Sequence, residues 1–243
     1  MMPGPFFGEF MGTLVLILLG NGVVANVLLR RSKAEGAGWV AITAGWGFAV
    51  VFGVFTAKAC GSADANLNPA VTLGVAVASG DFSRLAPFAV AQLLGAMTGA
   101  TLVWLHFLPH WEATEDSGLK HGCYCTSPAI RAPLANALSE IIGTFVLVLG
   151  AAAIFSKTVA PSGFDPGLGP YLVGVLVWSI GLSLGGTTGY AINPARDFGP
   201  RIMHSFLPIG KKGSSDWAYA PVPILGPLIG AALAGLFARL VHL

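Results

Sequence analysis

The sequence predicts an all-α membrane protein with six transmembrane helices and two re-entrant half-helices, arranged as an inverted 3+3 repeat. Three observations support this fold class. The chain has 243 residues, of which 54% are hydrophobic and only 10% charged, whereas soluble domains carry roughly 25% charged residues. Two parts of the chain repeat one another, and each repeat contains the triplet Asn-Pro-Ala. The composition therefore indicates a bilayer as the solvent, and the repeat indicates how the spans are arranged.

Six uncharged stretches are candidates for membrane-spanning helices, each of which needs about 20 apolar residues. They cover residues 10–29, 36–57, 85–105, 141–156, 166–192 and 217–238. No basic residue precedes the first stretch, so we expect a retained span and not a cleaved signal peptide. The chain also has 33 glycines, which predict close contact between helix backbones, as at Gly95 and Gly99 of the third stretch.

The repeat is visible at two places in each half. Glu9 and Glu140 each begin the pattern Glu-x-x-Gly-Thr followed by aliphatic residues, and the triplets are Asn68-Pro69-Ala70 and Asn193-Pro194-Ala195. Three spans per half is an odd number, so the second half must enter the membrane inverted relative to the first. We therefore expect one transmembrane domain over 1–243, with repeat one at about 5–108, a loop at 109–132 and repeat two at about 133–242.

The segments that follow the triplets are too short to cross a bilayer. They cover residues 69–79 and 194–206, and we expect both to be half-helices. The loops before them, 61–67 and 185–192, are rich in Gly, Ser, Thr and Asn. Irregular backbone is tolerated at membrane depth only where it is buried in protein or lines a water-filled cavity. These four segments therefore predict a pore.

Helix capping explains the chemistry of each triplet. Asn is a preferred N-cap, and Pro is preferred at the first helical position, where no N–H is needed. Capping alone would explain one triplet, but two copies at matching places of an inverted repeat favour a functional role. Because the cap uses the side-chain carbonyl, we expect the NH2 groups of Asn68 and Asn193 to be free donors. With two positive helix ends at mid-membrane, such a pore would repel cations and block proton relay.

The whole chain resembles the major intrinsic protein family, the aquaporins and aquaglyceroporins. The resemblance rests on all six spans, both half-helices, both glutamates, both triplets and Arg196 directly after the second triplet. It implies an aquaporin-like fold and a passive, bidirectional channel without a cofactor. It also implies a homotetramer with one pore per subunit, and a multi-pass protein of the cell (inner) membrane with cytoplasmic N- and C-termini.

The charges of the loops favour the opposite orientation. With a cytoplasmic N-terminus, three basic residues lie inside, namely Arg84, Lys157 and Arg239, and six lie outside, namely Arg30, Arg31, Lys33, Lys120, Lys211 and Lys212. Basic residues are usually enriched on the cytoplasmic side. We follow the orientation that the resemblance implies.

Four residues match the selectivity filter of the family, namely Trp46, Gly181, Tyr190 and Arg196. A guanidinium in the pore offers several donors to hydroxyls or water and raises a barrier to cations. Trp46 would hold the carbon backbone of a polyol, and Gly181 stands where water channels carry His, so together they widen the filter. Simpler alternatives are an Arg196 that pairs with Asp197, and a Trp46 that only packs against helices or lipid.

Other residues near the triplets bear on the subclass and on support of the pore. Asp197 resembles the acidic residue of the glycerol-conducting branch, although a carboxylate in the first turn is also favoured by the helix dipole. Tyr190 stands where glycerol facilitators usually have Phe, Asn66 stands where His is common, and residues 58–66 are about two longer than usual. The resemblance implies that Glu9 and Glu140 accept hydrogen bonds from the pore loops; the alternative is a helix-end glutamate that reaches the interface.

We therefore expect a channel for glycerol and other small neutral solutes, including urea or small polyols, together with water. A water-selective aquaporin and a secondary transporter remain alternatives. We do not expect an enzyme, because no spacing in the sequence brings a nucleophile and a base together. His204 is expected to pack inside the protein and not to act in catalysis. The net charge of +2 without a basic run excludes nucleic acid. For Cys123 and Cys125, near His106, His110 and His121, an exposed loop is favoured over a metal site.

Overall fold

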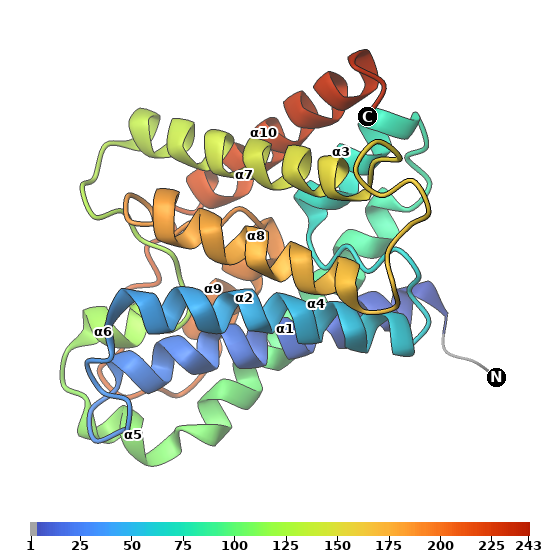
Figure 1. Cartoon of the computed structure of the whole chain (residues 1–243). Coiled ribbons are helices and arrows are strands. Elements are labelled where there is room, and N and C mark those ends of the chain that lie inside the picture. The colour runs from blue at the N-terminus through green and yellow to red at the C-terminus, as the bar shows by residue number, and fades with distance from the viewer. Residues whose placement is uncertain (1–3) are drawn as a thin grey trace.

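The computed structural model describes residues 4–243, and every regular element in this range is a helix. Figure 1 shows the long helices side by side, with their axes running roughly in one direction. The six predicted spans are α1 (Pro5–Leu28), α2 (Gly38–Ala59), α4 (Leu85–His106), α7 (Pro133–Phe155), α8 (Leu168–Leu184) and α10 (Pro221–Leu240). The predicted half-helices are α3 (Pro69–Ser79) and α9 (Pro194–Phe206). The predicted fold class is confirmed.

The bounds of the spans differ from those that the uncharged stretches suggested, most of all in three helices. Helices α1 and α7 begin at Pro5 and Pro133, well before residues 10 and 141, because both helices continue through a glutamate that is buried inside the protein. Helix α8 ends at Leu184 and not at residue 192, since residues 185–192 leave the helix as the loop before the second triplet. Its 17 residues are at the short end of the range for a membrane span.

The segment between the two halves is more structured than a plain loop. It contains the short helices α5 (Leu108–Ala113) and α6 (Ser117–Gly122), which the sequence analysis did not predict. The side chain of Asp116 caps α6 by accepting hydrogen bonds from two backbone N–H groups. Cys123, Tyr124 and Cys125 are buried, so the expectation of an exposed loop was wrong for these residues.

The two halves pack in matching ways and interlock. Helix α1 packs along α4 as α7 packs along α10, and α1 contacts α2 as α7 contacts α8. Each half-helix also packs against the last span of the other half, α3 against α10 and α9 against α4. Figure 1 shows the start of α1 and the end of α10 at one end of the bundle and α5 and α6 at the other.

Glycines allow the closest of these helix contacts. A Cβ atom added to Gly95 of α4 would lie 2.3 Å from the backbone oxygen of Phe10 in α1. In the second half, a Cβ atom on Gly230 of α10 would lie 2.3 Å from the backbone oxygen of Ile141 in α7. The same backbone-to-backbone approach thus occurs twice, as small residues at membrane helix interfaces permit.

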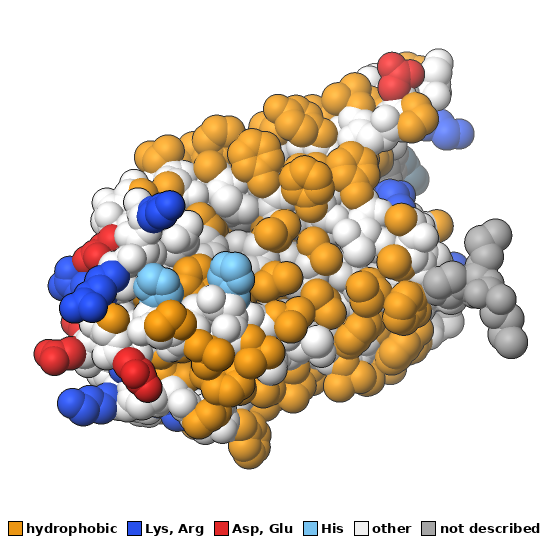
Figure 2. All heavy atoms as spheres, turned by 90° about the horizontal axis from the view of Figure 1, so that it is seen from below, with side chains coloured by type: hydrophobic (Ala, Val, Ile, Leu, Met, Phe, Trp, Pro, Cys, Tyr) orange, Lys and Arg blue, Asp and Glu red, His pale blue; other side chains and the backbone are white. Residues whose placement is uncertain are grey.

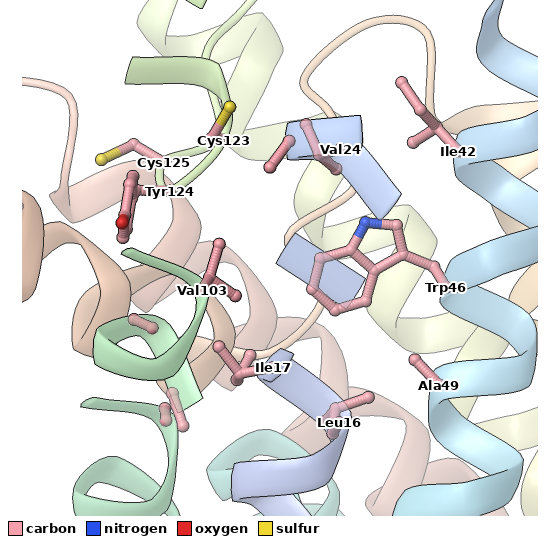
Figure 3. Packing of buried hydrophobic residues seen from close by; sticks show 14 of the residues in the cluster. Leu16, Ile17, Val24, Ile42, Trp46, Ala49, Val103, Cys123, Tyr124 and Cys125 are labelled. Carbon is pink, nitrogen blue, oxygen red and sulfur yellow. The ribbon is translucent and has the colours of Figure 1, made fainter. Parts of the chain in front are cut away.

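The outer surface and the interior are both largely apolar. Figure 2 shows hydrophobic side chains over most of the visible face, while many charged side chains gather at the end where α5 and α6 lie. Several large apolar side chains are exposed, among them Phe48, Phe52 and Leu225. In the interior, Figure 3 shows Trp46 reaching from α2 towards α1. An apolar exterior of this kind suits contact with lipid tails.

Candidate functional site

A cavity of about 460 Å³ lies where the two halves meet. Much of its wall is apolar and comes from several spans, including Leu16, Val50, Val54, Leu147, Val148 and Val177. The polar lining comes mainly from the two pore loops and the starts of the half-helices, with Asn66, Asn68, Asn193 and Arg196. Apolar walls with a few fixed polar groups are typical of small-molecule sites.

The asparagines of both triplets cap their half-helices. Asn68 Oδ1 accepts hydrogen bonds from the N–H groups of Ala70 at 2.8 Å and Val71 at 3.4 Å. Asn193 Oδ1 does the same with Ala195 at 3.0 Å and Arg196 at 3.2 Å. Both asparagines have extended backbones, as N-cap residues do, and Pro69 and Pro194 begin the helices.

The NH2 groups of the two asparagines are not wholly free, which corrects the sequence-based expectation. Asn68 Nδ2 donates to the backbone oxygen of Ile192 at 2.8 Å, and Asn193 Nδ2 donates to the backbone oxygen of Leu67 at 2.9 Å. Each amide therefore bonds the loop of the opposite half, because the two loops lie against one another. One N–H of each NH2 group remains for a solute, and its direction is fixed by the other.

The two pore loops have the same strained backbone. Non-glycine residues adopt positive φ at Ala65 (47°) and Leu67 (54°) in the first loop, and at Tyr190 (36°) and Ile192 (42°) in the second. Such conformations cost about 1–3 kcal/mol each and persist only where the surroundings enforce them. The two loops therefore need strong supporting contacts.

Glu9 supplies the support of the first loop. The carboxylate accepts hydrogen bonds from the N–H groups of Asn66 at 2.9 Å and Leu67 at 2.8 Å. It also accepts from Ser62 Oγ at 2.7 Å and Gln92 Nε2 at 2.8 Å. Glu9 is 0% exposed, so a glutamate that reaches the membrane interface is excluded here.

Glu140 supports the second loop at the matching place. Its two carboxylate oxygens accept from the N–H groups of Ala191 at 3.0 Å and Ile192 at 2.8 Å. Glu140 is 1% exposed, so its carboxylate does not reach the protein surface either. Each carboxylate thus satisfies two buried N–H groups of an irregular chain, which would otherwise be costly at membrane depth.

Arg196 and Trp46 lie face to face beside the cavity. The Arg196 Cζ atom lies 4.1 Å from the ring centroid of Trp46, a cation–π distance. Within residues 4–243 the Arg196 guanidinium makes no hydrogen bond or ion pair, so its N–H donors are unpaired. Trp46 is 3% exposed and also packs closely against Gly20 of α1. Trp46 therefore contacts Arg196 as well as the neighbouring helix, so packing against helices alone does not describe it.

Gly181 and Tyr190 form a contacting pair. A Cβ atom on Gly181 would lie 2.9 Å from Cζ of the Tyr190 ring, so the ring occupies the space that a side chain would need. Gly181 is not part of the cavity wall, whereas Tyr190 is. Gly181 therefore makes room for the Tyr190 ring instead of leaving open space. Trp39 meets the Tyr190 ring edge-on at 5.7 Å, and the buried Tyr190 hydroxyl has no hydrogen-bond partner in the described part of the chain.

Asp197 does not pair with Arg196, which excludes that simpler reading of the arginine. It forms a fully buried ion pair with Arg201, one turn later, with Nε to Oδ1 at 2.7 Å. Sequence reasoning missed Arg201, although an i,i+4 acid–base pair was a readable signal. Asp197 also lies in the first turn of α9, where the dipole favours a carboxylate.

Asn66 lines the cavity but makes a weaker contact than the capping residues. Its Nδ2 donates to Thr72 Oγ1 at 3.3 Å, and Gln92 Nε2 donates to the same oxygen at 3.2 Å. Thr72 Oγ1 in turn donates to the backbone oxygen of Asn68 at 3.0 Å. Asn66 therefore belongs to a polar network between the Glu9 support and the first cap. Neither Gln92 nor Thr72 carried a signal in the sequence.

The cysteine-containing segment lies apart from the cavity. Cys123 and Cys125 are unbridged, and burial raises the pKa of both thiols, which disfavours the thiolate that a metal requires. Among the described residues, no group of three or more His, Cys, Asp or Glu side chains is placed to hold a metal ion. His204 is fully buried against His121 and Tyr124 and shares a 2.8 Å hydrogen bond with Ser215.

Comparisons with known proteins agree with this architecture. The family model described as Major intrinsic protein matches residues 4–238. The chain is 57% identical to glycerol uptake facilitator protein 3 of Lactiplantibacillus plantarum, over 94% of this chain and 93% of that protein. It is 54% identical to the glycerol uptake facilitator protein of Streptococcus pneumoniae strain R6, over 97% and 98%.

A solved structure has the same fold. The X-ray structure of the aquaglyceroporin from Plasmodium falciparum superposes with a TM-score of 0.82 at 29% identity, covering 98% of this chain and 95% of that one. The inverted bundle, the abutting half-helices and the cavity between them define an integral, multi-pass membrane channel. The chain belongs to the major intrinsic protein family. The resemblance to its aquaglyceroporin branch, which the sequence indicated, is confirmed.

Proposed function

We propose that this channel conducts glycerol, other small neutral solutes such as urea and small polyols, and water, while it excludes ions and protons. The observation that carries the proposal is the pairing of Arg196 with the face of Trp46 at the cavity wall. The names of the two bacterial relatives, both glycerol uptake facilitators, support the same solute.

We infer that the part of the cavity lined by Trp46, Tyr190 and Arg196 is its constriction, and this lining suits an amphipathic solute. Arg196 offers unpaired N–H donors that can bind the hydroxyl oxygens of a polyol. Trp46 and Tyr190 present aromatic surface on which the carbon backbone can lie. A linear polyol has hydroxyls along one side and C–H groups along the other, so both surfaces are used at once. Glycerol is the small polyol that fits this description best.

The two caps provide the barrier to ions. The N-termini of α3 and α9 lie at the cavity, and the positive end of each helix dipole disfavours a cation there. The remaining N–H of Asn68 and of Asn193 orients a passing oxygen as an acceptor, which interrupts a proton relay through water. The apolar wall opposite, including Leu16 and Leu147, cannot replace the hydration shell of an ion.

Stopped-flow swelling of proteoliposomes in glycerol, urea and sorbitol tests the proposal. We expect rapid glycerol entry above that of empty liposomes, linear in the gradient, with slower sorbitol entry. Rapid water flow without glycerol entry would contradict the proposal and favour a water-selective aquaporin. Saturable uptake that depends on an ion gradient would instead favour a secondary transporter.

We further propose a homotetramer in the cell membrane, with both termini in the cytoplasm. The start of α1 and the end of α10 lie at one end of the bundle, as an even number of spans requires (Figure 1). Two of the six basic residues at the other end, Lys120 and Lys212, have structural partners that account for their position. Lys212 Nζ donates to the backbone oxygens of Ser205 at 2.8 Å and Leu207 at 2.6 Å, at the end of α9, and Lys120 Nζ donates to Gly210. Lysines that stabilise the negative end of a helix weaken the charge count as a guide to orientation.

A further inference from the structure

All three polar groups of Thr126, namely its N–H, its hydroxyl and its backbone oxygen, bond residues of the second half-helix. The N–H and the Oγ1 hydroxyl of Thr126 donate to Asp197 Oδ2 at 2.8 and 2.7 Å. The backbone oxygen of Thr126 accepts from Arg201 Nη2 at 3.0 Å. Thr126, Asp197 and Arg201 therefore form one closed set of hydrogen bonds, which we call the Thr126 clasp.

The clasp also reaches the segment before the last span. Arg201 Nη1 donates to the backbone oxygens of Ser215 at 2.6 Å and Asp216 at 3.1 Å. Arg201 and Asp197 are both 0% exposed. Burying an ion pair is unfavourable unless most of its donors and acceptors are satisfied, and here they are. Such a rigid arrangement suits a positioning role.

The clasp lies beside the turn that leads to Tyr190, which lines the cavity. A methyl group placed on Gly189 would lie 3.5 Å from Cβ and from Cγ2 of Thr126, so the Thr126 side chain faces the turn before Tyr190. The segment that contains Thr126 is tied to the pore loop once more, because the N–H of Ala129 donates to the backbone oxygen of Thr187 at 3.0 Å. Tyr190 is a non-glycine residue with a positive φ of 36°, so this turn needs support from outside.

We propose that Thr126 and Arg201, acting through Asp197, are positioning residues that set the width of the pore constriction at Tyr190. The inference rests on the proposed function, because it assigns the constriction to solute selection. The clasp holds Thr126 beside the Gly189–Tyr190 turn, and the turn places the Tyr190 ring in the cavity wall that Arg196 and Trp46 also line. Asp197 thereby acts on selectivity without touching a solute.

The sharpest variant is Thr126→Ser. It keeps the hydroxyl that binds Asp197, so the clasp and the fold are retained, but it removes the methyl group that faces Gly189. The turn then yields more easily to a larger solute. We expect the permeability ratio of erythritol to glycerol to rise about fourfold, which corresponds to the contact of one buried methylene group. This ratio is independent of the amount of folded channel in the vesicles.

Thr126→Val provides the complementary change. It keeps the methyl group and removes the hydroxyl, so Asp197 loses a hydrogen bond and the segment around Thr126 is held less firmly. We expect the permeability ratio of erythritol to glycerol to rise and the thermal stability to fall. Thr98→Ser and Thr98→Val are the matched controls, because Thr98 Oγ1 bonds only Leu94 of its own helix, at 2.9 Å. Both controls should keep the wild-type ratio.

The outcomes separate this inference from the proposed function. If the wild type passes glycerol and Thr126→Ser keeps the wild-type ratio, the positioning role is wrong while the proposed function stands. If the wild type passes water but no glycerol, the proposed function is wrong, and the positioning role then requires that Thr126→Ser gain glycerol or urea entry. A loss of all fluxes by one common factor in Thr126→Ser would also overturn the inference.

Discussion

At the scale of single residues, the asparagines of the two triplets have more than one structural role. The carbonyl oxygen of Asn68 caps its own half-helix, and its amide nitrogen bonds the loop of the opposite half. Asn193 repeats both contacts. A residue of another type could make one of these contacts, but Asn offers an acceptor and two donors on a short side chain. Each asparagine thus caps its own half-helix and also binds the two halves of the protein together.

We expect Asn68→Ala and Asn193→Ala to impair the channel more than Asn66→Ala. Loss of an N-cap costs about 0.5–2 kcal/mol, and each of the first two variants also loses the bond to the other half. Asn66→Ala loses only the 3.3 Å contact with Thr72. Thermal unfolding in detergent and glycerol swelling per folded protein measure the difference. Wild-type-like flux and stability in all three variants would refute this role of the caps.

The residues found from the sequence and those missed differ in one physical respect. Asn68, Asn193 and Arg196 belong to local patterns, in which adjacent residues share one helix start, so the sequence displays them together. Thr126 is distant in sequence from the half-helix whose carboxylate it binds, and a lone threonine in a loop carries no pattern. Its contact arises only from tertiary packing, which the sequence does not display.

At the scale of elements, the half-helices were predictable and the ends of some spans were not. Asn-Pro at the start and Gly80 after the end are strong local signals, and α3 has the bounds that they imply. Hydropathy places the start of α7 too late, because a charged residue looks like the edge of a membrane span. Glu140 instead lies inside the helix, where backbone N–H groups of the loop compensate its charge. Burial of a paired carboxylate cannot be read from hydropathy.

The close helix contacts give a prediction at this scale. We expect Gly95→Ala to lower stability by about 1–3 kcal/mol, because the new methyl group would meet the Phe10 carbonyl and force α1 and α4 apart. Gly22→Ala is the matched control, since a Cβ atom there has nothing within 4 Å and the change should stay within about 1 kcal/mol. Thermal unfolding of both variants measures this difference. Equal stability of the two variants would contradict tight packing at Gly95.

At the scale of the whole molecule, the two halves depend on one another. Each half-helix packs against the last span of the other half, and each capping asparagine bonds the opposite loop. The inverted repeat was evident from the sequence because its motifs recur, but this exchange of contacts was not, since no local pattern states which helices are neighbours. The shared cavity is a consequence of the exchange.

A thiol block of the cavity shows directly whether solutes pass through it. Val54 of α2 lines the cavity, whereas Val90 of α4 is 52% exposed on the outer surface. We expect a small mercurial reagent to abolish most glycerol entry in Val54→Cys and to leave wild type and Val90→Cys nearly unchanged. The wild type controls for the native Cys60, Cys123 and Cys125. Unchanged glycerol entry in a Val54→Cys protein whose added thiol is shown to be modified would contradict solute passage through this cavity.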